Sequence, residues 1–123
     1  MRAGARWSRS AAWLGLAGAS LMGVAHATCP ATPEVMATQA RDAESAYARQ
    51  DFVGFAAARA AMLDATRCLT ASPTPVQVAD VHRIQALWAY RSDQEEEARA
   101  SLLAMHSANP EADLALDYAP SGH

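Results

Sequence analysis

Two cysteines are the residues of this 123-residue chain best suited to chemistry. Cys29 and Cys68 stand 39 positions apart, far too long a spacing for a redox motif with two intervening residues. Two thiols without a nearby histidine cluster also make a poor zinc site. An even number of cysteines in an exported chain is typical of a disulfide. We therefore predict a Cys29–Cys68 bond, which the chain-entropy model values at about 4 kcal/mol for such a loop.

The other reactive side chains form no catalytic or metal-binding pattern. His82 and His106 should lie at different levels of one helical hairpin, about four residues or ~6 Å apart along its axis, so they do not make a zinc pair. No serine stands in a nucleophile elbow, and no glycine-rich loop could hold a phosphate. We expect no enzyme activity, no cofactor and no metal site.

Residues 1–27 have the three parts of a secretory signal peptide. A start with three arginines is followed by an uncharged stretch, residues 11–24, and by small residues at the two positions that a signal peptidase reads, Ala25 and Ala27. The uncharged stretch is shorter than the ~20 residues that span a bilayer. We expect export to the periplasm or the extracellular medium, no stable membrane span after cleavage, and one folded domain over residues 28–123.

Removal of that leader leaves an acidic chain. The leader holds three of the ten basic residues, all of them arginines, and none of the 13 acidic ones, so residues 28–123 carry a net charge of −6. This balance gives no attraction to nucleic acid or to an anionic membrane, and it favours basic partners. The chain is 51% hydrophobic, which excludes disorder for most of its length.

The mature part is rich in alanine, the strongest helix former, and has no long strand-like alternation. Four helices are predicted, at about 34–49, 52–69, 75–91 and 94–108, with an irregular tail over 111–123. Pro33 suits the first helix start, Asp51 and Asp93 are predicted N-caps, and Thr74 with Gln77 makes a capping box. The fold class is therefore all-α, with two stacked antiparallel helical hairpins clamped by the disulfide.

The two hairpins align with each other at an offset of 42 residues, which pairs Asp51 with Asp93 and Ala56 with Ala98. Each unit then consists of a helix, a tight turn containing an aspartate, and a second helix. Ala98 should lie opposite Ala86, where the helices approach most closely, so a bulky side chain at Ala98 is expected to destabilise the hairpin.

The second hairpin has small, apolar and proline residues in a spacing known from helical repeats. They are Ala86, Ala98, Leu102, Met105 and Pro110. Over residues 79–111 the chain thereby resembles a tetratricopeptide repeat, with His82 and Gln85 in place of two large apolar residues. The resemblance implies an interaction scaffold that binds peptides or partner subunits along a concave face, rather than a catalyst.

Three side chains are candidate partner contacts: Tyr47, His82 and Tyr90. Trp88 continues the apolar stripe of the third helix, so its neighbour Tyr90 should be more exposed, and aromatic residues are enriched in interfaces. We expect an adaptor or scaffold in the bacterial envelope, with an unidentified protein partner. The alternatives are a helical bundle that binds a small molecule or peptide between its hairpins, and a structural envelope protein without a ligand.

Two hairpins are few for a free-standing solenoid, which normally has three repeats or more. This shortage predicts that the protein forms a homo-oligomer or docks onto a larger assembly.

Cleavage is predicted between Ala27 and Thr28, because the small residues that a signal peptidase reads end at Ala27. N-terminal sequencing of the exported protein should start at Thr28. A mature form that still contains Arg2 would contradict the prediction.

Overall fold

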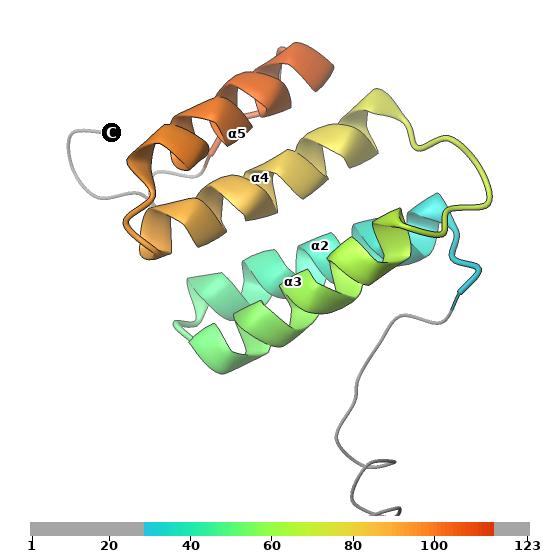
Figure 1. The fold of residues 1–123 in the computed structure, drawn as a ribbon, viewed down its shortest axis with the longest axis horizontal. Helices are drawn as coiled ribbons and strands as arrows, with labels where there is room; N and C mark the ends of the chain where they lie inside the picture. The colour runs from blue at the N-terminus through green and yellow to red at the C-terminus, as the bar shows by residue number, and fades with distance from the viewer. Residues whose placement is uncertain (1–28, 115–123) are drawn as a thin grey trace, which may run out of the picture.

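The structure, a computed structural model, describes residues 29–114, which form four α-helices in two antiparallel hairpins (Figure 1). The helices are α2 (Pro33–Ala48), α3 (Phe52–Thr66), α4 (Pro75–Arg91) and α5 (Glu95–Ala108). The predicted all-α class with two hairpins is confirmed. The predicted leader and the end of the tail, from residue 115 on, lie outside the described residues. No helix within 29–114 is long and apolar enough to cross a membrane.

Most helix starts follow the residues that the sequence predicts. α2 begins at Pro33, and the Asp51 carboxylate caps α3 by accepting the Gly54 N–H at 2.9 Å. A Cβ at Gly54 would contact that carboxylate, so a larger residue there requires the Asp51 side chain to shift. At α4 the capping box is complete: Thr74 Oγ1 accepts the Gln77 N–H at 3.2 Å, and Gln77 Oε1 accepts the Thr74 N–H at 2.8 Å.

The two hairpin turns have the same backbone construction. Each contains one left-handed residue, Gln50 with φ 60° or Asp93 with φ 57°. In each turn the N–H groups of this residue and of the next one donate to carbonyls of the preceding helix. In the first turn Gln50 donates to Tyr47 O at 2.9 Å and Asp51 to Ala46 O at 2.9 Å. In the second turn Asp93 donates to Tyr90 O at 3.2 Å and Gln94 to Ala89 O at 2.8 Å. Both turns are therefore Schellman motifs, in which the last carbonyls of the helix find donors.

The predicted N-cap role of Asp93 is wrong. α4 has 17 residues where α2 has 16, so the left-handed position falls on Asp93, a residue type that tolerates it. The N-cap is Gln94, whose side chain makes no capping hydrogen bond, and α5 starts at Glu95. Equivalent turn residues are thus 43 apart, not 42.

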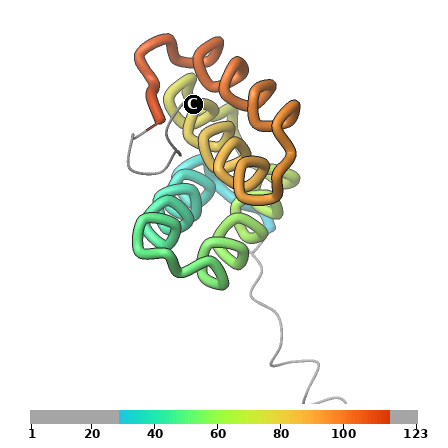
Figure 2. The backbone as a smooth tube through the Cα atoms, turned by 90° about the vertical axis from the view of Figure 1, so that its left-hand side faces the viewer, coloured from blue at the N-terminus to red at the C-terminus, as the bar shows by residue number. Residues whose placement is uncertain are grey.

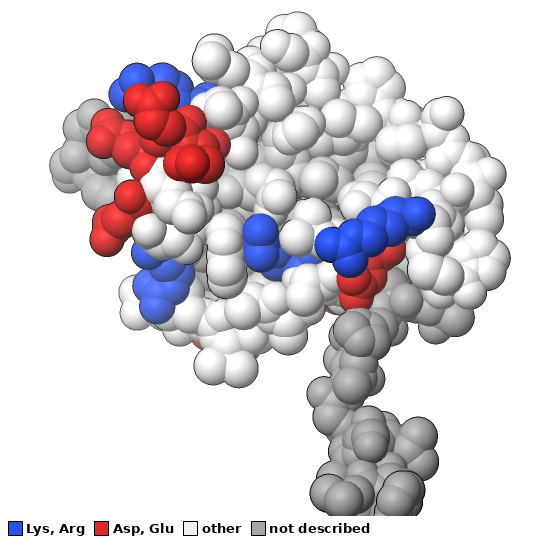
Figure 3. Space-filling model, viewed as in Figure 1, with Lys and Arg blue, Asp and Glu red and all other residues white. Residues whose placement is uncertain are grey.

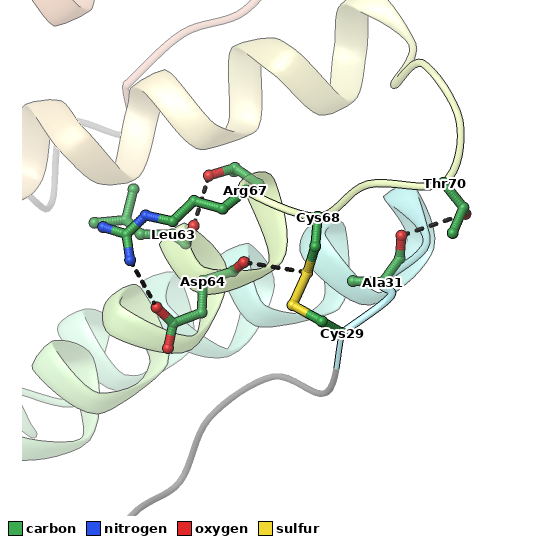
Figure 4. Close-up of a disulfide and its surroundings, with 8 residues drawn as sticks. Cys29, Ala31, Leu63, Asp64, Arg67, Cys68 and Thr70 are labelled. Carbon is green, nitrogen blue, oxygen red and sulfur yellow. Dashed lines mark hydrogen bonds and ion pairs between the residues drawn. A yellow bond between two sulfur atoms is a disulfide. The ribbon is translucent and has the colours of Figure 1, made fainter.

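The disulfide joins the segment before α2 to the end of α3 (Figure 4). Cys29 and Cys68 are bonded, with their Cα atoms 5.7 Å apart, which confirms the predicted clamp. Two backbone hydrogen bonds lie beside it, from the Ala31 N–H to Cys68 O at 3.0 Å and from the Thr70 N–H to Ala31 O at 2.9 Å. This pairing takes Cys68 out of the helix, so α3 ends at Thr66, earlier than predicted.

α4 lies in the middle of the molecule. Figures 1 and 2 show it above α2 and α3, with α5 on its far side. Its Ile84 and Leu87 are fully buried in the main core. The other large, fully buried members of that core come from α2 and α3: Met36, Phe55 and Met62. A smaller core beyond α4 contains Ala79, Met105 and Ala112.

Alanines make this close packing possible. Ala43 of α2 and Ala86 of α4 occupy equivalent positions, 43 residues apart, and both are 0% exposed. A small side chain there lets neighbouring helices approach while it keeps the best intrinsic helix propensity.

We predict that the variant with both Cys29→Ala and Cys68→Ala loses about 2–5 kcal/mol of unfolding free energy, the usual effect of removing a disulfide from a small secreted domain. Urea unfolding can be followed by the fluorescence of Trp88, the single tryptophan after residue 27. As a direct check, reduction should add two hydrogens to the intact mass. Alkylation of both thiols in the native exported protein would contradict the bond.

The left-handed turn residues predict a gain in stability. Gln50→Gly should raise the unfolding free energy by about 0.5–1 kcal/mol, because the left-handed conformation costs a non-glycine residue more than glycine loses in chain entropy. Asp93→Gly should gain less, since aspartate tolerates this region better. Arg49→Gly, where φ is −86°, is the control and should not stabilise. Destabilisation by Gln50→Gly would show that the turn is misassigned.

The buried alanines predict that larger side chains at their positions lower the unfolding free energy. Ala43→Leu and Ala86→Leu should each cost about 1–3 kcal/mol, because the added atoms overpack a closed core. The exposed Ala57→Leu and Ala100→Leu are matched controls and should stay within about 0.5 kcal/mol of the parent. Thermal unfolding followed by circular dichroism would measure all four, and equal effects at buried and exposed positions would disprove the helix packing.

Candidate functional site

Aromatic rings fill the turn of the first hairpin. The Tyr47 ring meets those of Phe52 and Phe55 edge-on, with centroids 5.6 and 5.0 Å away. Phe55 is fully buried and also lies 6.1 Å from the Trp88 ring. This end of the first hairpin is therefore closed by packing that is worth more than its buried area alone.

The second hairpin has the same turn without the rings. Tyr90 stands 43 residues after Tyr47, but the equivalents of Phe52 and Phe55 are Glu95 and Ala98. A cavity of about 250 Å³ opens at this place. Tyr90 and Leu102, both half-buried, line it together with buried Ala98.

The cavity leads us to expect that a larger side chain at Ala98 is accommodated, in contrast to the destabilisation that the sequence predicts. Ala98 is 7% exposed, but one side of it faces the open space rather than a helix.

Acidic groups dominate the rim of the cavity. Exposed Asp93, Glu95 and Arg99 lie at its edge, and Glu96 and Glu97 belong to the same first turn of α5. Figure 3 shows the acidic side chains gathered at the upper left, over the start of this helix. The pair between Arg99 Nη2 and Glu95 Oε1 spans 3.5 Å and is largely exposed, so it contributes at most about 1 kcal/mol and can rearrange easily.

Two other arginines connect the hairpins. Arg59 Nε donates to Gln85 Oε1 at 2.8 Å, and its guanidinium lies 4.1 Å from the Trp88 ring centroid. Arg91 lies 3.4 Å over the Phe52 ring. Partial burial lowers the pKa of Arg59 from its ordinary value. Because these cations already stack on rings inside the molecule, we assign them to holding α3 against α4.

A second hollow, of about 230 Å³, lies between α2 and α4, where the alternative of a ligand bound between the hairpins would place it. The charged residue at its centre, Arg83, already has partners within the molecule. Arg83 pairs with Asp80 at 2.7 Å and Glu44 at 3.7 Å, and its Nε donates to the backbone oxygen of Asp113 at 3.2 Å. A ligand there would have to displace these contacts, so the hollow is a weaker candidate than the cavity beside Tyr90.

The three predicted partner contacts do not form one site. Tyr90, which is half-buried, lines the cavity. Tyr47 belongs to the aromatic cluster of the first turn, and His82, half-buried on α4, lines neither hollow. Among residues 29–114, no three His, Cys, Asp or Glu side chains are grouped so that they could hold a metal ion.

Ala98 and Glu95 were not among the site residues predicted from the sequence. The alignment of the two hairpins contains the signal that would have found them. At an offset of 43 residues Ala98 and Glu95 align with Phe55 and Phe52, whereas at an offset of 42 Ala98 aligns with another alanine.

In comparisons with protein-family models, curated proteins and solved structures, the chain matches none of them. What the cavity can do must therefore follow from its own residues.

The cavity predicts that Ala98→Phe is tolerated. The new ring should occupy the open space as Phe55 does in the first hairpin, and burial of its apolar surface should raise the unfolding free energy by about 1 kcal/mol. Ala100→Phe, on the exposed side of α5, should give no such gain. Urea unfolding of the two variants would check this, and a loss of more than about 1 kcal/mol in Ala98→Phe would mean that the cavity is absent in solution.

Proposed function

We propose that the mature chain is a small exported helical-repeat module that binds another protein and acts as an adaptor or scaffold in the bacterial envelope, without catalysis. The way α4 sits on both helices of the first hairpin supports the likeness to a tetratricopeptide repeat, because stacked hairpins of such arrays bury a continuous core. The buried small residue Ala86 agrees with that likeness.

The cavity beside Tyr90 is the observation that carries the proposal. α5 packs mainly against α4 and buries only Ala98 and Met105, so within residues 29–114 this helix is covered mainly on the side that faces α4. Concave sites with an apolar lining and a few polar groups are where proteins bind ligands and anchor residues of their partners. The first hairpin closes the equivalent place with its own Phe55.

Export is supported by the disulfide and by the leader-like residues 1–27. Disulfides form and persist in oxidising compartments, and a small domain with an alanine-rich core gains much from one.

Affinity purification tests the function. The mature chain would be immobilised in three forms, the parent, Ala98→Phe and Ala100→Phe, and exposed to extract from the producing cell envelope, with bound proteins identified by mass spectrometry. A partner retained by the parent and Ala100→Phe but lost by Ala98→Phe would support the proposal. Identical protein sets on all three forms would contradict it.

A further inference from the structure

We propose that the cavity at the α4–α5 turn binds a basic side chain, an arginine or a lysine, from a segment of the partner protein. This inference rests on the proposed function and names the chemistry that the site recognises.

The shape of the site suits a long, flexible side chain. Its volume of about 250 Å³ is several times the ~30 Å³ that one water occupies in the liquid. The inner lining comes from Tyr90, Ala98 and Leu102, which can cover methylene groups. Arginine and lysine commonly bury their aliphatic stems in this way while the charged end stays at the rim.

Charge selects a cation over other occupants. Among the lining residues Asp93 and Glu95 are acidic and Arg99 is basic, and Glu96 and Glu97 follow in the same first turn of α5. The start of α5 adds about +0.5 of an elementary charge, so the lining has a balance of about −0.5, and the lining together with Glu96 and Glu97 has about −2.5. An acidic side chain would be repelled by this balance, and a purely apolar one would desolvate rim carboxylates without giving them a partner.

The occupant must come from another molecule. The mature chain has no lysine. Of the other arginines, Arg59 and Arg91 stack on rings and Arg83 is held by Asp80 and Glu44. The remaining three lie in the first hairpin and contact residues of their own segment: Arg41 with Thr38, Arg49 with Asp51 and Arg67 with Asp64. Arg99 lies on the rim, on the same helix as Glu95, and its exposed ion pair with Glu95 can yield to an incoming guanidinium. A net charge of −6 over residues 28–123 also draws basic partners toward the molecule.

Titration with two matched probes tests the inference without the natural partner. N-acetyl-argininamide and N-acetyl-citrullinamide have nearly the same shape, but only the first is charged. Each is added to the ¹⁵N-labelled mature protein, and amide shifts are followed by NMR. We expect saturable shifts around Tyr90, Ala98 and Leu102 with the arginine probe, and binding of the citrulline probe weaker by roughly tenfold, because a charge-assisted hydrogen bond is lost.

Variants separate this site from any other weak binding. Ala98→Phe should abolish the shifts, whereas Ala100→Phe should leave them unchanged. The pair Asp93→Asn with Glu95→Gln keeps the shape of the rim and should weaken the arginine probe several-fold; this arm decides the outcome if Ala98→Phe does not fold.

Three results would overturn the inference: no localised shifts, equal binding of the two probes, or shifts that persist in Ala98→Phe. If a partner is still captured through the cavity while the probes bind equally, the proposed function stands and the basic anchor is wrong. If the arginine probe binds as expected and no partner is captured, the site stands and the adaptor function is wrong.

Discussion

The packing of α4 between two layers is the constraint on which the rest of the molecule depends. Ile84 and Leu87 of this helix are fully buried against α2 and α3, and Ala79 on its other side meets Met105 of α5. None of the other helices within residues 29–114 takes part in both cores. Because a domain of this size has only about 5–15 kcal/mol of stability in total, the loss of α4 from this position would leave neither hairpin with enough buried surface to fold alone.

The two hairpins have the same backbone turns but differ in how completely side chains fill the space beside those turns. Both turns have the same Schellman hydrogen bonds and a tyrosine two residues before the helix C-cap. In the first hairpin Phe55 completes the packing and the disulfide clamps the opposite end. In the second, Ala98 replaces that ring and acidic residues surround the space that remains. The well-packed first hairpin thus supports a second hairpin that leaves a cavity open beside Ala98.

Sequence reasoning reached most of the fold, because the deciding signals are local. The Thr74 capping box, the Asp51 cap and the alanine-rich segments define helices through contacts within a few residues. The disulfide followed from the even number of cysteines in a chain with a leader-like N-terminus. The end of α3 was misplaced because the backbone bonds that end it come from Ala31, which is distant in sequence.

Only part of the candidate site could be predicted from the sequence. Tyr90 was predicted as a partner contact, but the cavity that it lines depends on a one-residue difference in length between α2 and α4 that composition does not reveal. That extra residue moves Asp93 into the left-handed position and shifts the register that pairs Ala98 with Phe55. Once a repeat offset is wrong by one, every inference about which side chains are equivalent is wrong as well.

Native-state hydrogen exchange of the mature protein tests the central role of α4 most directly. The amides of α4 should exchange only through global unfolding, together with those of α2 and α3, because all three share the main core. The amides of α5 should open at a lower free energy, since this helix buries only Ala98 and Met105. An α5 protected as strongly as α4, or an α4 that opens before α2 and α3, would contradict this description of the molecule.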